Sequence, residues 1–425
     1  MINDQNKMYR RSVLGALGAA SLAGCIGGGG GNSGNTVEVT HWEEDAEAQH
    51  RYDQMETWSS SHEDWEAELR LVPGDPAEEY HESMQTEIAG GEGPDILYLQ
   101  YEASYPSFSS ENALQNLDSL IEEGEINLDD YYERSIDMYT WTDGSMYALP
   151  AQVTPASGFW YNTELFEEVG IESIPDNWTW EDFRGILEDL KEGGVDNPYI
   201  IPFNQSITDL FYPFIWQNGA EFVNEDYTES RINSSEAVEA LEFIVGLIED
   251  DLAVADVDIG DRYSVAFGEE LGAATLGGPW ILDHAMNEGI ADKIGCTTPP
   301  IPEGGEQASV LNSHGVGMNA NMESEAQLEL FKFLTSEDGV EYHLEALSGL
   351  SPMETHSDHP IFEEEPRLQP IQELIPHSNP MIFGEHTNQI VAEALLPPRQ
   401  GAYTGDLTPR EAIESMHNSI ESILS

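Results

Sequence analysis

Aromatic side chains gather where predicted strands end and loops begin. These rings are Trp42, Tyr101, Trp141, Trp160, Tyr161, Phe211, Tyr212, Trp280 and Phe383. A sugar presents an apolar face of C–H groups and a rim of hydroxyls, so its binding site combines flat rings with carboxylates or amides. Core packing is the competing interpretation. For Trp160 and Tyr161, the sequence favours neither core packing nor a binding role. Trp280 directly follows Gly-Gly-Pro at the end of a predicted strand, which favours a binding role.

The sequence lacks the motifs of common catalytic sites. It contains no G-x-x-x-x-G-K-[ST] loop and only 4 Lys, which argues against nucleotide hydrolysis. It contains no His-Glu-x-x-His pair and no Gly-x-Ser-x-Gly elbow, and its 12 His show no metal-ligand spacing. Carboxylate pairs occur everywhere among 81 acidic residues, so they identify no hydrolase site. We expect no catalytic residue, no metal and no cofactor.

Acidic residues dominate the charge of the chain. The 81 Asp and Glu outnumber 15 Lys and Arg, and the net charge is −66. Such a surface repels itself at ordinary ionic strength, but molar salt shortens the Debye length to about 3 Å and screens the repulsion. We interpret the composition as adaptation to a salt-saturated habitat, such as that of a haloarchaeon. A basic patch for nucleic acid cannot be assembled, and 40% hydrophobic residues exclude a disordered acidic protein.

The first residues are predicted to be an export signal, residues 1–24, rather than part of the fold. Tyr9 to Leu14 resembles a twin-arginine motif, and the apolar stretch after it is too short to span a bilayer. Leu22 to Cys25 resembles a lipobox, which predicts that Cys25 is attached to lipid; the alternative is a plain signal peptide with a chance cysteine. Residues 25–35 are then a flexible tether. Cys296 is the only other cysteine, and a lipid-modified Cys25 cannot pair with it, so we expect no internal disulfide.

Strands and helices alternate in the first part of the mature chain. Apolar runs at 37–42, 69–72 and 95–99 predict strands, and the segments between them have helical spacing. This order indicates a parallel, doubly wound sheet, which binds ligands at the carboxyl ends of its strands. The residues at those ends are Trp42-Glu43-Glu44-Asp45 and Gln100-Tyr101-Glu102.

The stretch from Asp143 to Phe183 carries a sequence of local signals. Pro150 stops one strand, Thr163 is predicted to cap a short helix that Gly170 closes, and Thr179 with Asp182 predicts the start of a longer helix. Farther along, residues 273–277 form a strand of small residues. The sharp end at Gly278-Pro279 predicts that the Trp280 ring projects from the edge of the sheet.

These signals, in this order, resemble the extracellular solute-binding proteins of ABC importers, the family that includes maltose-binding protein. The matching positions are Gly144, Tyr147, Pro150, Tyr161-Asn162, Gly170, Pro175 and Thr179-Trp180-Glu181, with Gly91 to Ile96 and the Gly-Pro-Trp that ends at Trp280. The resemblance covers nearly all of residues 36–425. Each motif alone is weak, and their order makes the resemblance specific.

The resemblance implies an α/β, two-lobed periplasmic-binding-protein-like fold. Each lobe would be a doubly wound sheet flanked by helices, with three hinge crossings near Pro150, Pro302 and Gly349. The lobes would be residues 36–152 with 303–348, and residues 153–302 with 349–425. The candidate ligand-binding residues are Trp42, Glu43, Asp45, Tyr101, Glu102, Gln152, Asp209, Tyr212, Trp280, His314 and Phe383. Leu99 stands where the family usually has an aromatic, and the loop with Asp209 has no recognisable sugar-binding pair, so the sugar is left open.

The expected function is that of a substrate-binding component of an ABC importer. It would be a monomer, held on the extracellular face of the membrane by Cys25, and would pass a carbohydrate to the permease. A cationic ligand such as a polyamine is an alternative, because cations also bind aromatics and carboxylates. A secreted glycoside hydrolase and a surface-layer protein are the competing classes.

Overall fold

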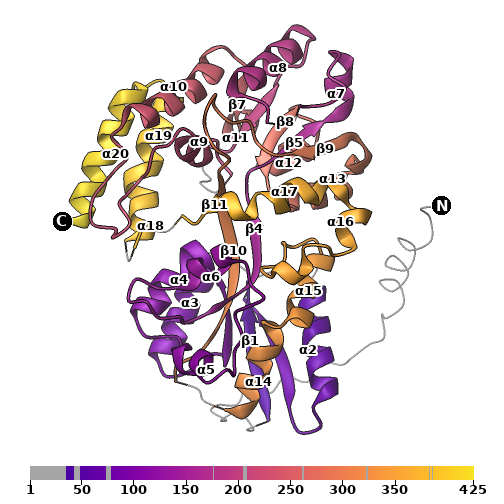
Figure 1. Ribbon diagram of the computed structural model, residues 1–425, viewed down its shortest axis with the longest axis vertical. Coiled ribbons are helices and arrows are strands. Elements are labelled where there is room, and N and C mark those ends of the chain that lie inside the picture. The colour runs from indigo at the N-terminus through magenta and orange to yellow at the C-terminus, as the bar shows by residue number, and fades with distance from the viewer. Residues whose placement is uncertain are drawn as a thin grey trace. The chain divides into compact units, whose positions relative to one another are not determined.

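Two strands that run side by side connect the two halves of the fold (Figure 1). The computed structural model describes residues 35–42, 48–72, 78–175, 177–203, 208–260, 263–321, 324–381, 383–384 and 386–425. Residues Thr36–Ser425 form one compact unit, and the description below concerns that unit. Its two lobes confirm the two-lobed fold predicted from the sequence.

The first lobe is built on a sheet of six strands. They are β1 (Thr36–His41), β2 (Glu66–Leu71), β3 (Ile96–Gln100), β4 (Leu149–Pro155), β10 (Ser309–Met318) and β11 (Ser378–Asn379). The order is β11-β10-β3-β1-β2, and β4 also pairs with β10. The pairs β1–β2 and β1–β3 are parallel, whereas β10 is antiparallel to both β3 and β4. Strand β3 is apolar and fully buried from Ile96 to Leu99, as expected of a strand that is covered on both faces.

Helices flank this sheet and complete the first lobe. They are α2 (Gln49–Ser61), α3 (Glu78–Ala89), α4 (Tyr101–Ser110), α5 (Asp118–Glu122), α6 (Glu133–Tyr139), α14 (Glu325–Leu334) and α15 (Glu337–Glu345). The strand–helix–strand order predicted for this lobe is confirmed.

The second lobe is more mixed than the predicted doubly wound sheet. Strand β5 (Gly158–Asn162) lies between β8 (Ala274–Gly277) and β9 (Ile294–Thr297) and is antiparallel to both. Strands β6 (Tyr199–Ile201) and β7 (Ala253–Ala255) form a separate parallel pair. Because β5 follows β4 after a two-residue connection, it enters the lobe in the opposite direction to β8 and β9, which α13 (Trp280–Glu288) joins.

The second lobe also contains helices. They are α7 (Thr163–Glu168), α8 (Trp180–Glu192), α9 (Phe211–Gln217), α10 (Ser235–Glu249), α11 (Asp256–Ile259), α12 (Tyr263–Gly268), η1 (Ala291–Lys293), α18 (Thr387–Gln389), η5 (Ile390–Leu395), α19 (Leu396–Tyr403) and α20 (Pro409–Leu424). The predicted start of α8 is confirmed, since Thr179 and Asp182 form a capping box. The predicted cap of α7 is wrong by one residue: Asn162 accepts from the Glu164 and Leu165 N–H groups. An amide side chain at this position satisfies two helix-start donors at once.

The chain passes between the lobes at β4, at β10 and in the segment that follows Gly349. Leu350 forms a bridge with Val153 of β4. Residues 351–356, which the sequence assigned to the second lobe, lie against residues 130–135 of the first, where the Glu354 N–H donates to the Asp130 carbonyl at 2.8 Å. The next short helices are η2 (Glu354–His356), α16 (Ile361–Glu364), η3 (Pro366–Leu368), α17 (Gln369–Glu373) and η4 (Ile375–His377).

Among the described helices, none combines the length and the apolar character that crossing a bilayer requires.

Candidate functional site

Trp42 and His314 meet at the first-lobe side of the crossing strands. Trp42 follows β1, and its ring stacks on His41 with centroids 4.0 Å apart. The edge of the same ring approaches His314, on β10, with centroids 4.8 Å apart. Strand β10 brings His314 opposite Gln100 of β3 and Gln152 of β4. Two of the predicted site residues are therefore in contact, although 272 positions of sequence separate them.

Gln152 fixes the orientation of His314. Its Nε2 donates to His314 Nδ1 at 2.8 Å and to the Ser348 carbonyl at 3.3 Å, while its Oε1 accepts from Ser348 Oγ at 3.3 Å. The two contacts with Ser348 set which end of the amide is nitrogen. The neutral imidazole then carries its proton on Nε2, where it is a hydrogen-bond donor. This gives the site a donor held in place by β4 and by the Gly349 crossing.

Trp280 occupies the second-lobe side of the same strands. Helix α13 begins at this residue, three positions after strand β8 ends at Gly277. Its half-buried indole donates through Nε1 to the Tyr263 hydroxyl at 2.7 Å. A Cβ at Gly278 would lie 2.4 Å from Trp280 Cζ3 and 2.7 Å from Thr154 Cγ2, so the ring and Thr154 lie together beside Gly278.

Thr154 and Gln152 connect these two sides. Side chains two residues apart on a strand share a face, and the side chains of both residues lie within about 3 Å of where a Cβ of Gly349 would be. The order along the crossing strands is therefore Trp42, His314, Gln152, Thr154 and Trp280. This set, called the cleft row below, has an aromatic ring at each end and hydrogen-bonding groups between them.

A cavity of about 300 Å³ lies between Tyr101 and Trp141 on the first lobe and residues 225–227 and Pro380 on the second. Asp137, Glu225 and Asp226 add carboxylates to its lining, and Tyr227 adds a third ring. A volume of this size is at the lower end for small-molecule sites. The predicted site residue Tyr101 is thus placed at a hollow between the lobes, with its own ring largely buried.

Tyr227 is a lining residue that sequence reasoning missed. It sits at the tip of a turn in which Asn224 Oδ1 accepts from the Thr228 and Glu229 N–H groups. Its φ of 54° lies in the left-handed region, which is costly for a bulky residue and often marks a functional position. The Asn and Asp residues around it indicate a turn, but nothing in the sequence indicates which side chain the turn presents.

Three other predicted site residues lie inside the second lobe. Asp209 is fully buried, and its carboxylate accepts from the Tyr403 hydroxyl at 2.6 Å and the Phe211 N–H at 2.7 Å, with Arg399 Nη1 3.5 Å away. Burial raises the pKa of Asp209 and opposes the effect of Arg399. Tyr212 and Phe383 are buried beside Phe222. The structure therefore does not bring these three residues to the cleft row.

Four predicted residues lie outside the described part of the chain. They are Glu43, Asp45 and Cys25, together with the side chain of Glu102.

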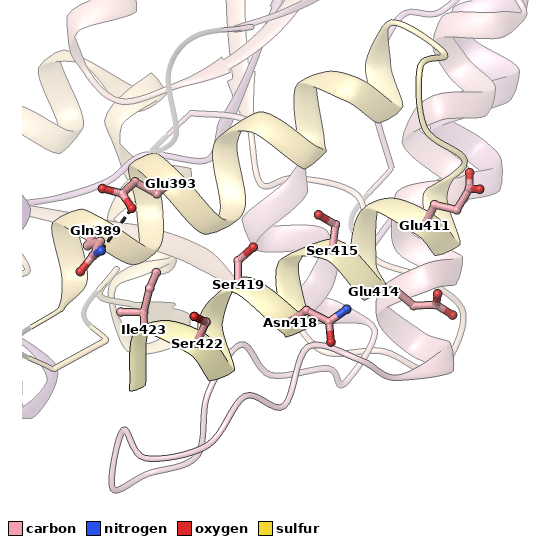
Figure 2. A pocket seen from close by; sticks show the side chains of 9 residues that line it. All are labelled: Gln389, Glu393, Glu411, Glu414, Ser415, Asn418, Ser419, Ser422 and Ile423. Carbon is pink, nitrogen blue, oxygen red and sulfur yellow. Dashed lines mark hydrogen bonds between the residues drawn. The ribbon is translucent and has the colours of Figure 1, made fainter. Parts of the chain in front are cut away.

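A second, larger groove of about 750 Å³ lies on the outer surface of α20 and the neighbouring α18–η5 segment (Figure 2). Its lining consists of Glu, Gln, Ser and Asn side chains and Ile423, with no aromatic ring. Figure 2 shows these side chains spaced along the helices rather than converging on one point. The groove therefore lacks the chemistry of the cleft row and is not the candidate site.

Among the described residues, Glu341, Glu345 and His359 place three potential metal-ligand atoms within 4.8 Å of one another. His359 Nδ1 accepts from the Ile361 N–H at 3.2 Å, so the neutral ring has its proton on Nε2. That proton points to Glu341 Oε1, 3.0 Å away. A metal ion at Nε2 would need the lone pair of that nitrogen, but the proton occupies it. His359 and Glu341 are therefore a hydrogen-bonded pair beside the carboxylate of Glu345.

Comparison with known proteins gives a consistent result. The model of a family described as bacterial extracellular solute-binding protein matches residues 57–341. An uncharacterized ABC transporter extracellular-binding protein of Pyrococcus horikoshii is 22% identical over 225 residues, which is 52% of this chain and 50% of that protein. The chain spans about half the length of the curated relatives it matches.

Solved structures match the fold over nearly the whole chain. The GacH receptor of Streptomyces glaucescens GLA.O, solved unliganded and with acarbose, has a TM-score of 0.78 and 18% identity, covering 92% of this chain and 98% of that one. Maltose-bound MalE3 of T. maritima has a TM-score of 0.78 and 21% identity, covering 91% and 99%. At these identities the likeness establishes the two-lobed fold.

Proposed function

Because the chain belongs to the bacterial extracellular solute-binding protein family, we propose that it captures a carbohydrate between its two lobes and delivers it to the permease of an ABC importer. The cleft row is the observation that carries this proposal. Trp42 and Trp280 supply the flat rings that a sugar face needs, and His314, oriented by Gln152, supplies a hydrogen-bonding group between them.

The known ligands of similar structures support the proposal that the ligand is a carbohydrate. Acarbose and maltose are bound in two proteins of the same fold. In this chain the site would include Trp42, Gln152, Trp280, His314 and Tyr101, with Tyr227 as an addition. Glu43, Asp45 and Glu102 remain proposed contacts from the first lobe, because carboxylates there would accept hydrogen bonds from sugar hydroxyls.

The first residues of the chain support a proposal about where the protein is located. Proteins of this family act outside the cell membrane. We propose that residues 1–24 are an export signal of the twin-arginine type, that Cys25 carries lipid, and that the chain works as a monomer in high salt. The tether before Thr36 would let the unit approach the permease. Mass spectrometry of the membrane fraction should find an N-terminal peptide that begins at Cys25 and carries lipid.

A cationic ligand is the second candidate, and the cavity favours it. Asp137, Glu225 and Asp226 line the hollow together with three aromatic rings, and no Lys or Arg is among its lining residues. Carboxylates with aromatic faces are the groups that bind an alkylammonium ion. A polyamine therefore competes with a sugar for the assignment.

A ligand screen by thermal shift in molar KCl separates the two candidates. Glucose, maltose, maltotriose and D-tagatose represent sugars, and spermidine represents cations. A ligand at a hundred times its Kd should add about 2.7 kcal/mol of stability. Stabilisation by a sugar but not by spermidine supports the proposal, and the reverse result assigns the site to a cation. Chromatography of the bound sugar should recover it unaltered, since turnover would point to a hydrolase.

A further inference from the structure

The hydrogen bond between the Trp280 indole and the Tyr263 hydroxyl links the cleft row to the interior of the second lobe. Its donor Nε1 and acceptor oxygen are 2.7 Å apart. Tyr263 is the first described residue of α12 and is only 2% exposed, whereas Trp280 is half-buried. An indole has one polar atom, so this bond restrains rotation of the ring about the Cβ–Cγ bond.

The position of Tyr263 is itself fixed by a buried carboxylate. Asp256 Oδ2 accepts from the Tyr263 N–H at 3.3 Å, and Asp256 Oδ1 accepts from the Phe203 N–H at 2.9 Å. Phe203 lies two residues after the end of strand β6, and its carbonyl accepts from Arg399 Nη2 at 2.9 Å. The chain of contacts thus runs from Trp280 through Tyr263 and Asp256 to the end of β6.

We propose that Tyr263 is a positioning residue for Trp280, holding the indole at the angle at which it meets the ligand, and that Asp256 ties this hold to strand β6. The inference rests on the proposed function, because an aromatic platform requires a ligand that lies on it. Tyr263 acts through Trp280 and does not itself contact the ligand. A flat ring held at one angle loses less rotational freedom when it binds than a ring free to turn.

Tyr263→Phe removes the hydroxyl and keeps the ring. The Kd for maltose in molar KCl should rise about three- to tenfold, the equivalent of one ordinary hydrogen bond. Tyr131→Phe is the matched control, since it removes a buried hydroxyl that donates to the Thr335 carbonyl within the first lobe. The melting temperature should fall by a similar amount in both variants, and only Tyr263→Phe should lose affinity for maltose.

A second set of variants tests whether Tyr263 acts through Trp280. Trp280→Phe keeps an aromatic ring without the N–H group. In that background Tyr263→Phe should leave the maltose affinity unchanged, because the bond is already absent. A further loss of affinity in the double variant, or no loss in Tyr263→Phe alone, overturns the proposal.

A measurement without ligand separates this inference from the proposed function. The chain has nine Trp, and labelling with 5-fluorotryptophan gives each of them a signal in the fluorine NMR spectrum. The signal that is missing from the spectrum of Trp280→Phe belongs to Trp280. Tyr263→Phe should shift or broaden this signal, and Tyr131→Phe should not. If none of the screened sugars binds the unaltered protein, the sugar assignment fails, while an unmoved Trp280 signal overturns the positioning role.

Discussion

At the scale of single residues, Trp280 separates a binding role from a packing role. Its ring is half-buried and packs against both large apolar clusters, so it contributes to each. We expect Trp280→Ala to weaken binding of the sugar found by the screen by about 2 kcal/mol or more, as loss of a buried aromatic contact does. Calorimetric titration and urea unfolding in molar KCl measure the two effects separately.

The matched control is Trp65→Ala, because Trp65 is also partly buried but stacks on Trp58 and His62 in the first lobe. This variant should keep normal affinity. Loss of about 3–5 kcal/mol of unfolding free energy in Trp280→Ala, with unchanged affinity, would assign the ring to the core instead.

Asp209 offers a second residue-scale prediction. Its carboxylate is the counter-charge of Arg399, and both side chains are fully buried. Asp209→Asn leaves a buried cation without its partner, so we expect a loss of about 3–5 kcal/mol in the free energy of unfolding. Urea unfolding in molar KCl measures it. Asp209→Asn combined with Arg399→Gln should recover part of the loss; if the double variant is no more stable than the single one, the pair does not account for the effect.

Residue types and spacing predict some of this site and leave the rest undetermined. Trp42 and Tyr101 could be predicted as candidate site residues because an apolar run shows where a strand ends. The start of α13 at Trp280 was missed, although the apolar Ile281, Leu282 and Ala285 after Pro279 have helical spacing. The bond from Tyr263 to Trp280 joins two separate helices, and no local pattern encodes such a contact.

At the scale of elements, buried histidines join the strands and helices of the first lobe. His41 of β1 and His343 of α15 are fully buried, and burial, aided by Arg51, holds the pKa of each well below its usual value. His343 Nε2 lies 3.4 Å from the Tyr98 hydroxyl of β3. Both rings are therefore neutral in the folded protein near neutral pH.

These histidines predict that stability falls in mild acid. Below pH ~6.5 the unfolded chain binds protons that the folded chain does not, so each histidine should remove about 1.4 kcal/mol of unfolding free energy per pH unit. Urea midpoints at pH 7, 6 and 5 in molar KCl measure the slope. His343→Asn should reduce it, and a slope that does not change would show that the protons bind elsewhere.

Element boundaries follow the sequence where local chemistry decides them. Thr179 caps α8 at the predicted position, and Ser234 and Thr408 cap α10 and α20 through their side-chain oxygens. The mixed strand directions of the second lobe were not predictable in this way, because β5 has the same apolar pattern whether its neighbours run parallel or antiparallel to it. Tertiary position decides the direction.

At the scale of the whole molecule, the charge of −66 predicts dependence on salt. Screening of the acidic surface should raise the free energy of unfolding as KCl rises from 0.3 M to 3 M. Each kcal/mol corresponds to ~2–4 °C in melting temperature for a domain of 150–250 residues. Melting in sucrose of matched water activity is the control, because sucrose does not screen charge. An equal rise in sucrose would contradict the electrostatic explanation.

Strand β10 also constrains how the protein is made. It supplies the centre of the first sheet, between β3 and β4, yet it is synthesised long after both. A ribosome that has passed Pro155 has made two strands whose common partner begins only at Ser309. Throughout that interval their open edges are available to other chains. The first sheet can therefore be completed only after residue 318 has emerged, and a chain cut short near Pro302 would lack the strand between β3 and β4.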